Sequence, residues 1–106
     1  MTENVRAILA ELRRRFEGLY GDRLVAMVLY GSQARGDAEP GSDIDVLVVL
    51  KGPVDPCQEI RRTTDDVWAI AYEHEQSIAC VFVSQDEFER ERSPLMLNVH
   101  REGVPL

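Results

Sequence analysis

The stretch Leu29–Val49, which reads LYGSQARGDAEPGSDIDVLVV, decides the fold. It starts as an apolar strand, turns at a Gly-Ser pair into a short helical segment, crosses a Pro-Gly loop and enters a second apolar strand through two acids. Because side chains alternate between the two faces of a strand, Asp43 and Asp45 are predicted to point to the same side. The sequence thus predicts two carboxylates held close together where the second strand begins.

Two neighbouring carboxylates raise each other's pKa and destabilise a fold unless a cation or hydrogen-bond donors lie between them. Asp43 alone is typical of a turn, but Asp45 stands inside a strand beside Val and Leu residues, where burial of an unpartnered acid is costly. Mg²⁺ prefers oxygen ligands and completes its coordination with water and substrate phosphates. We therefore predict that Asp43 and Asp45 bind Mg²⁺ and that the site takes a nucleotide.

The turn at Gly31 and Ser32 lies between the first strand and the helical segment. Glycine lets a backbone approach a ligand closely, and the N–H groups and dipole at a helix start attract phosphate. A tight turn explains Gly31 on structural grounds alone, and Ser32 is equally suited to cap the helix. Both structural roles are compatible with phosphate binding, so Gly31 and Ser32 are predicted to bind the outer phosphates.

Two further polar residues of this stretch have open roles. Arg35 either pairs with Asp37 or Glu39 at the surface or reaches the triphosphate through its planar guanidinium group. Ser42 either caps the loop, which the turn chemistry favours, or contacts phosphate. Arg35 and Ser42 are therefore candidate nucleotide-binding residues, each with a structural alternative.

The remaining segments alternate between helical and strand patterns. The expected helices cover residues 2–19, 32–35, 56–72, 84–91 and 93–102, and the expected strands cover residues 24–30, 44–50 and 77–83. The apolar residues expected to face the sheet from the two long helices are Val5, Ile8, Leu9, Leu12, Phe16 and Leu19 on the first, and Ile60, Val67, Trp68, Ala71 and Tyr72 on the other. This order predicts an α/β sandwich with a small sheet covered mainly on one side.

Composition limits the possible partners and surroundings. At 106 residues we expect one domain over residues 1–106, and the net charge of −7 argues against sequence-independent binding to nucleic acid. No apolar run approaches the ~20 residues that span a bilayer, and the first residues lack the pattern of a secretory signal. Cys57 and Cys80 have no metal-binding spacing. We expect a cytoplasmic protein, for which a homo-oligomer is possible.

The spacing in the central stretch resembles a known family signature. Gly31-Ser32 is followed after ten residues by Asp43-Ile44-Asp45, as in the minimal nucleotidyltransferases of the DNA polymerase beta-like nucleotidyltransferase superfamily. The tail Glu102–Leu106 is also similar to the ends of these proteins. The resemblance implies an α+β fold with a small mixed β-sheet packed by helices, the polymerase beta-like palm.

The resemblance also implies a function. Such proteins move a nucleotide to an acceptor hydroxyl, and many are antitoxins that adenylylate a tyrosine on a small helical HEPN toxin. It implies Mg²⁺-dependent transfer of AMP from ATP, or of another NMP, to such a partner. The residues that match the signature are Asp43 and Asp45 as catalytic metal ligands and Gly31, Ser32, Arg35 and Ser42 around the nucleotide.

One departure from the family leaves a second function open. Many relatives carry a third acid on the next strand, whereas the run Ser77–Val83 contains no carboxylate. Glu73 or Glu75, just before that run, could replace it. The alternative is a catalytically impaired module that neutralises a partner by stoichiometric association. Transfer to a small molecule such as an aminoglycoside is a weaker alternative, because those enzymes usually need extra substrate-binding elements.

Overall fold

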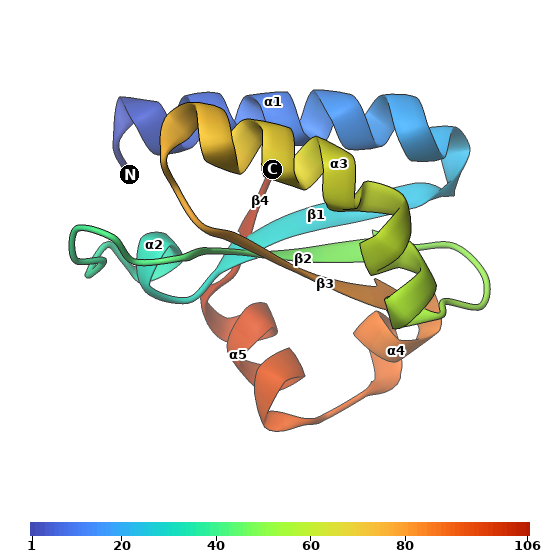
Figure 1. Ribbon diagram of the computed structural model, residues 1–106. Coiled ribbons are helices and arrows are strands. Elements are labelled where there is room, and N and C mark those ends of the chain that lie inside the picture. Colours follow the sequence, from blue (N-terminus) through green and yellow to red (C-terminus); the bar gives the residue numbers. More distant parts are fainter.

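The structure, a computed structural model that describes residues 1–106, is a mixed four-stranded sheet between two unequal layers of helices (Figure 1). No helix combines the length with the apolar character that crossing a membrane requires. In chain order the elements are α1 (Glu3–Tyr20), the short 3-10 helix η1 (Gly21–Arg23), β1 (Leu24–Tyr30), α2 (Ser32–Arg35), β2 (Ile44–Leu50), α3 (Pro56–His74), β3 (Ile78–Ser84), α4 (Gln85–Arg90), α5 (Pro94–Glu102) and β4 (Val104–Pro105).

Helix starts follow the capping residues in the sequence. Thr2 accepts a hydrogen bond from the Val5 amide at the start of α1, and Asp55 caps α3, whose first residue is a proline. Ser84 and Glu87 form a capping box at the start of α4. The predicted helices are therefore confirmed, with ends that shift by two residues or fewer.

The strand order in the sheet is β3-β2-β1-β4. β1 is antiparallel to β2 and to β4, while β2 is parallel to β3. The helix α3 makes the crossover that a parallel pair requires. This mixed sheet confirms the arrangement that the family resemblance implies.

Both faces of the sheet are covered, and the larger apolar cluster lies on one side, in line with the expectation of cover mainly on one side. From β2, the residues Ile44, Val46 and Val48 belong to the larger apolar cluster with α1 and α3. The alternate residues Leu47 and Val49 belong to a smaller cluster that also holds the buried residues of α5. Figure 1 shows α1 and α3 on one side of the sheet and α4 and α5 on the other. The apolar run of β2 thus reflects burial on both faces.

The short strand β4 was not predicted, because two residues that include a proline do not read as a strand. Val104 lies opposite Leu29 of β1, and the Leu106 amide donates to the Met27 carbonyl. A Cβ atom on Gly103 would lie 2.4 Å from the Val99 carbonyl oxygen, so only glycine fits where α5 turns back to the sheet. The family-like tail therefore forms the fourth strand.

The inward face of α3 differs from the prediction. Ile60, Trp68 and Tyr72, expected in the core, are 51%, 67% and 83% exposed, whereas Glu59 and Thr63 are buried. The periodicity of apolar residues predicted the wrong face, because the face of α3 that is buried begins with the polar residues Glu59 and Thr63. The prediction of Trp68 and Tyr72 as core residues is therefore wrong.

Glu59 is buried because it has three side-chain partners. It accepts hydrogen bonds from the Tyr20 hydroxyl at 2.7 Å and from Arg62 Nε at 2.9 Å, and Arg23 Nη1 lies 3.5 Å away. Burial favours the neutral acid, but these partners together hold the pKa of the Glu59 carboxyl below its usual value. The same contact explains why Tyr20 is buried while its neighbour Leu19, predicted to face inward, is 41% exposed.

Candidate active site

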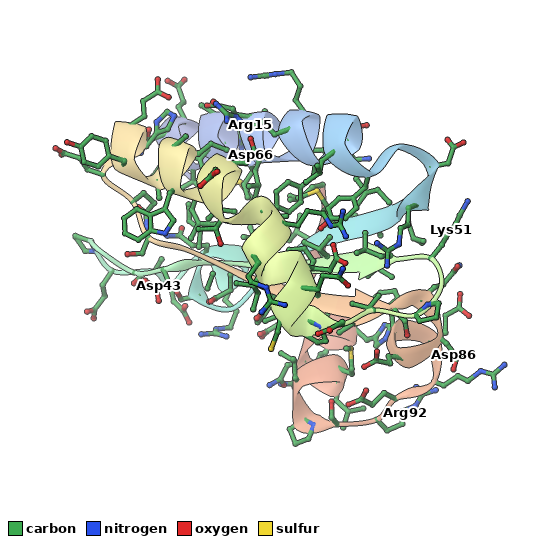
Figure 2. The ribbon with its side chains drawn as sticks, turned by 45° about the vertical axis from the view of Figure 1, so that its right-hand side comes forward. Arg15, Asp43, Lys51, Asp66, Asp86 and Arg92 are labelled. Atoms are coloured by element: carbon green, nitrogen blue, oxygen red, sulfur yellow. The ribbon has the colours of Figure 1, made fainter.

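Asp43 and Asp45 lie where β2 begins, and Figure 2 shows Asp43 at one end of the sheet. Asp43 is exposed in the loop that precedes β2, and Asp45 is half-buried within β2. Tyr30 of β1 and Ala79 of β3 lie opposite Asp45 on its two sides. Since Ile44 belongs to the cluster of α1 and α3, Asp45 points to the other face of the sheet, toward the side of α5.

The Asp45 carboxylate has no hydrogen-bond donor or ion-pair partner in the structure. Burial, and then the negative charge of Asp43, raise the pKa of Asp45, while the positive charge of Arg35 lowers it. Burial and the Asp45 charge also raise the pKa of Tyr30, which packs against the α5 side of the sheet. Two oxygen ligands with unneutralised charge and open space around Asp43 fit a hard divalent cation such as Mg²⁺.

Gly31 brings the turn before α2 against Asp45. Its backbone has φ 78° and ψ −158°, a region that only glycine occupies readily. A Cβ atom at this position would lie 2.6 Å from Asp45 Oδ2. The Gly31 carbonyl accepts the amides of Ala34 and Arg35, which closes the turn into α2. The structure therefore brings Gly31 against Asp45, with Ser32 as the next residue and the first of α2.

Gly31→Ala is expected to lower the free energy of unfolding by about 1–3 kcal/mol and to displace Asp45, because the new methyl group adds backbone strain and a clash. Gly36→Ala is the matched control. Gly36 also has a positive φ, but its Cβ would meet nothing within 4 Å. Thermal unfolding and Mg²⁺ titration would check this: both variants lose stability and only Gly31→Ala loses Mg²⁺ binding. Equal Mg²⁺ affinity in the two variants would contradict the role of Gly31.

Arg35 is held by two carboxylates. Its Nε lies 3.1 Å from Asp37 Oδ2, and its Nη1 lies 3.1 Å from Glu102 Oε1 at the end of α5. The surface pairing with Asp37 is thus present, and the pairing with Glu39 is not. No local pattern predicts Glu102 as a neighbour of the site, because 67 positions separate it from Arg35. Only its place in the family-like tail pointed to this contact.

Ser42 takes the loop-capping role that the turn chemistry favours. Its hydroxyl accepts the Glu39 amide at 3.0 Å, and its carbonyl accepts the Gln76 side chain at 2.6 Å. Gln76 lies between α3 and β3, so it ties the loop before Asp43 to the neighbouring strand. Ser42 and Gln76 therefore hold the loop that carries Asp43.

No third carboxylate stands on β3 beside the pair, because Ala79 is the residue opposite Asp45. Glu73 lies with Glu11 and His74 between α1 and α3, across the sheet from Asp45. Glu75 is the exposed residue that ends α3, and it lines a groove with Trp68 on the α3 side. The structure does not bring Glu73 into the site, and it places Glu75 with the α3 surface.

Solved structures with the same fold include toxin–antitoxin complexes. One, crystallised with AMP-PNP, matches at 17% identity with a TM-score of 0.61 over 88% of this chain and 68% of that chain. Another holds a tri-AMPylated HEPN toxin of Shewanella oneidensis with its MNT antitoxin, and matches at 18% identity and a TM-score of 0.54 over 96% and 67% of the chains. At these identities the likeness establishes the fold, which is the polymerase beta-like nucleotidyltransferase fold.

Two proteins of Methanocaldococcus jannaschii match a segment of 44 residues. "Putative protein adenylyltransferase MJ1305" is 43% identical over 42% of this chain, and "Putative protein adenylyltransferase MJ0141" is 39% identical over the same share. The matched part spans only 30% and 44% of those two proteins. The family model described as a nucleotidyltransferase domain matches residues 5–99, which is most of the chain. The chain therefore belongs to the nucleotidyltransferase domain family.

Proposed function

We propose that this protein is a Mg²⁺-dependent nucleotidyltransferase that moves AMP from ATP to a hydroxyl group of a partner protein. The observation that carries the proposal is the half-buried, unpaired Asp45, which lies beside Asp43 and against the Gly31 backbone. A carboxylate in this position weakens the fold unless a cation neutralises it. A carboxylate beside a glycine turn is the arrangement that a combined cation and phosphate site requires.

Each residue of the site has a distinct task in this proposal. Asp43 and Asp45 would hold Mg²⁺, which when bound neutralises triphosphate charge and stabilises the charge that develops on pyrophosphate. Gly31 lets the phosphates approach the backbone, and Ser32 donates its hydroxyl at the start of α2. Arg35 adds a positive charge that lowers the pKa of Asp45 and lies close enough to attract the phosphates. The acceptor hydroxyl then attacks the α-phosphorus, and pyrophosphate leaves.

Ser42 has a positioning task in this scheme rather than a phosphate contact. Its hydroxyl is engaged by the Glu39 amide and its carbonyl by Gln76. These bonds hold the loop from which Asp43 projects. The distance between the two acids therefore depends on Ser42 as well as on the strand.

The proposed acceptor is a tyrosine of a small helical HEPN toxin, which would make this protein the antitoxin of a pair. Support comes from the neighbour that holds a tri-AMPylated HEPN toxin and from the two matched adenylyltransferases. The exposed Asp43 leaves the site accessible to a protein-borne hydroxyl. ATP is the proposed donor, because a neighbour was crystallised with AMP-PNP.

A second candidate is a binding module that neutralises its partner without turnover. Ala79 favours it, because this residue lies beside Asp45 at a place where a third carboxylate could serve as a metal ligand or base. Under this alternative the partner is bound but not modified. The two candidates predict different outcomes for the same variant.

The test is incubation with Mg²⁺, ATP and the product of the adjacent gene, followed by intact-mass measurement of both proteins. The expected result is a gain of one or more AMP groups on the partner, lost in Asp43→Asn/Asp45→Asn and in EDTA. Undiminished transfer by the double variant would overturn the assignment of the two acids. A stable complex without AMP, formed equally well by the double variant, would establish the binding module instead.

A further inference from the structure

The edge strand β3 has an unprotected outer side. Its other side pairs with β2, and no backbone hydrogen bond beyond that pairing is made along Ile78–Ser84. The strand reads IACVFVS, without a charged residue or a proline. Natural edge strands usually carry such residues to block pairing with another chain. β3 is therefore free to accept a further strand.

An apolar surface adjoins this edge. Ile60, Trp68 and Tyr72 form the exposed stripe of α3, each more than half exposed. Trp68 lines one groove with Ile78 and Cys80 of β3. The α3 stripe and the β3 edge are thus one continuous surface. Its three large apolar side chains are not part of the core of the protein.

Two unpaired charges of opposite sign flank Trp68 on this surface. Arg61 and Glu75 have no ion-pair or hydrogen-bond partner for their side chains. Each lies seven positions from Trp68, one before it and one after it. Seven residues make two helical turns of about 3.6 residues, so Arg61 and Trp68 lie on one line along α3, about 10 Å apart, and Glu75 is the left-handed residue that follows the last turn of the helix. A two-fold axis near Trp68 would place Arg61 opposite the partner subunit's Glu75 and Glu75 opposite the partner subunit's Arg61.

We propose that this surface binds a second copy of the chain, in a dimer that pairs β3 with the partner subunit's β3 in antiparallel fashion. The axis would pass through the sheet near the middle of β3, close to Val81, and would keep α3 of both subunits on the same face. This geometry joins two four-stranded sheets, buries Trp68 against its counterpart and pairs Arg61 with Glu75 twice.

The occupant is a second copy rather than a helical partner, because a helical protein has no strand to satisfy the free edge of β3. Asp45 points to the opposite face of the sheet from α3, so the dimer leaves that acid accessible. The inference therefore stands independently of the proposed transfer reaction.

Charge exchange tests the dimer directly. Sedimentation velocity of the full chain is expected to show a dimer, and Arg61→Glu and Glu75→Arg are each expected to raise its dissociation constant at least about tenfold through like-charge contacts. A mixture of the two single variants, or the double variant R61E/E75R, restores both opposite-charge pairs and is expected to restore the dimer. Loss and rescue in this pattern would show that Arg61 and the partner subunit's Glu75 face each other across the dimer.

Trp68→Glu provides a second variant, and it is expected to give a folded monomer with an unchanged far-UV circular dichroism spectrum because Trp68 is exposed in the single chain. A monomeric wild-type chain at every concentration would overturn the dimer. So would a dimer that none of these substitutions weakens. If the wild-type chain is monomeric and Trp68→Glu abolishes binding of the HEPN protein, the surface belongs to that partner and the dimer is also overturned. AMP transfer, measured separately, tests the proposed function.

Discussion

Asp45→Asn is expected to stabilise the metal-free protein while it abolishes nucleotidyl transfer. The carboxylate is half-buried beside Asp43 with no donor to satisfy it, whereas the amide of asparagine carries no charge to desolvate. Solvent screens a partly exposed pair, so the gain is up to about 1 kcal/mol. The loss of a metal ligand removes several kcal/mol of transition-state stabilisation, which is a fall of about 10³-fold or more in rate.

The gain in stability should depend on pH in a defined direction. Folding raises the pKa of Asp45, so the folded state binds the proton more tightly than the unfolded state does. Protonation of Asp45 therefore stabilises the wild-type fold at low pH, and this stabilisation is lost as the pH rises through the folded-state pKa. Asp45→Asn carries no such proton. The difference in unfolding free energy should therefore be largest at neutral pH and vanish below the unfolded-state pKa of about 3.9.

Differential scanning calorimetry in EDTA and with Mg²⁺ would measure both parts. Mg²⁺ should stabilise the wild-type chain and leave Asp45→Asn unchanged, because only the former retains the carboxylate pair. Asp43→Asn is the matched control, and it should gain less stability because Asp43 is exposed. A metal-free Asp45→Asn less stable than wild type at neutral pH would show that Asp45 has a structural partner.

Glu59→Ala is expected to destabilise the fold. The change removes the acceptor of the Tyr20 hydroxyl inside the larger core and leaves Arg62 and Arg23 without their carboxylate. A buried hydrogen bond to a charged group, with the unsatisfied hydroxyl left behind, is worth about 2–3 kcal/mol. Chemical denaturation should show this loss in the midpoint.

The pH dependence of Glu59 has the opposite sign to that of Asp45. Folding lowers the pKa of Glu59, so its contribution to stability is present above the unfolded-state pKa and is lost as the pH falls through the folded-state pKa. Glu59→Gln keeps the shape and an acceptor for Tyr20, so it should cost less than Glu59→Ala at neutral pH. A double-mutant cycle with Tyr20→Phe isolates the pair. Additive effects of Glu59→Ala and Tyr20→Phe would contradict the coupling.

Asp45 and Glu59 show why the sequence reveals one buried acid and not the other. Asp45 interrupts an apolar strand, so its cost is visible in the sequence itself. Glu59 sits on a helix, where an acid is ordinary, and nothing local reveals that Tyr20 lies across from it. The apolar periodicity of α3 therefore predicted the wrong face of the helix as buried, with Trp68 and Tyr72 in the core, whereas both are exposed.

Long-range contacts limited the prediction of the site in the same way. The spacing from Gly31 to Asp45 was readable because a turn, a loop and strand alternation place residues that are near in sequence. The contact between Arg35 and Glu102 depends on β4, which pairs with β1 only after the tail folds back past Gly103. No local pattern encodes that pairing.

The sequence by itself determined the helix starts, the three main strands and the approach of Gly31 to the acid pair, because caps, turns and alternation act over a few residues. Only the tertiary structure decided which face of α3 is buried, that both faces of the sheet are covered, and which carboxylates hold Arg35. Those outcomes depend on the elements that pack together, and the free energy of burial is set by neighbours distant in the chain.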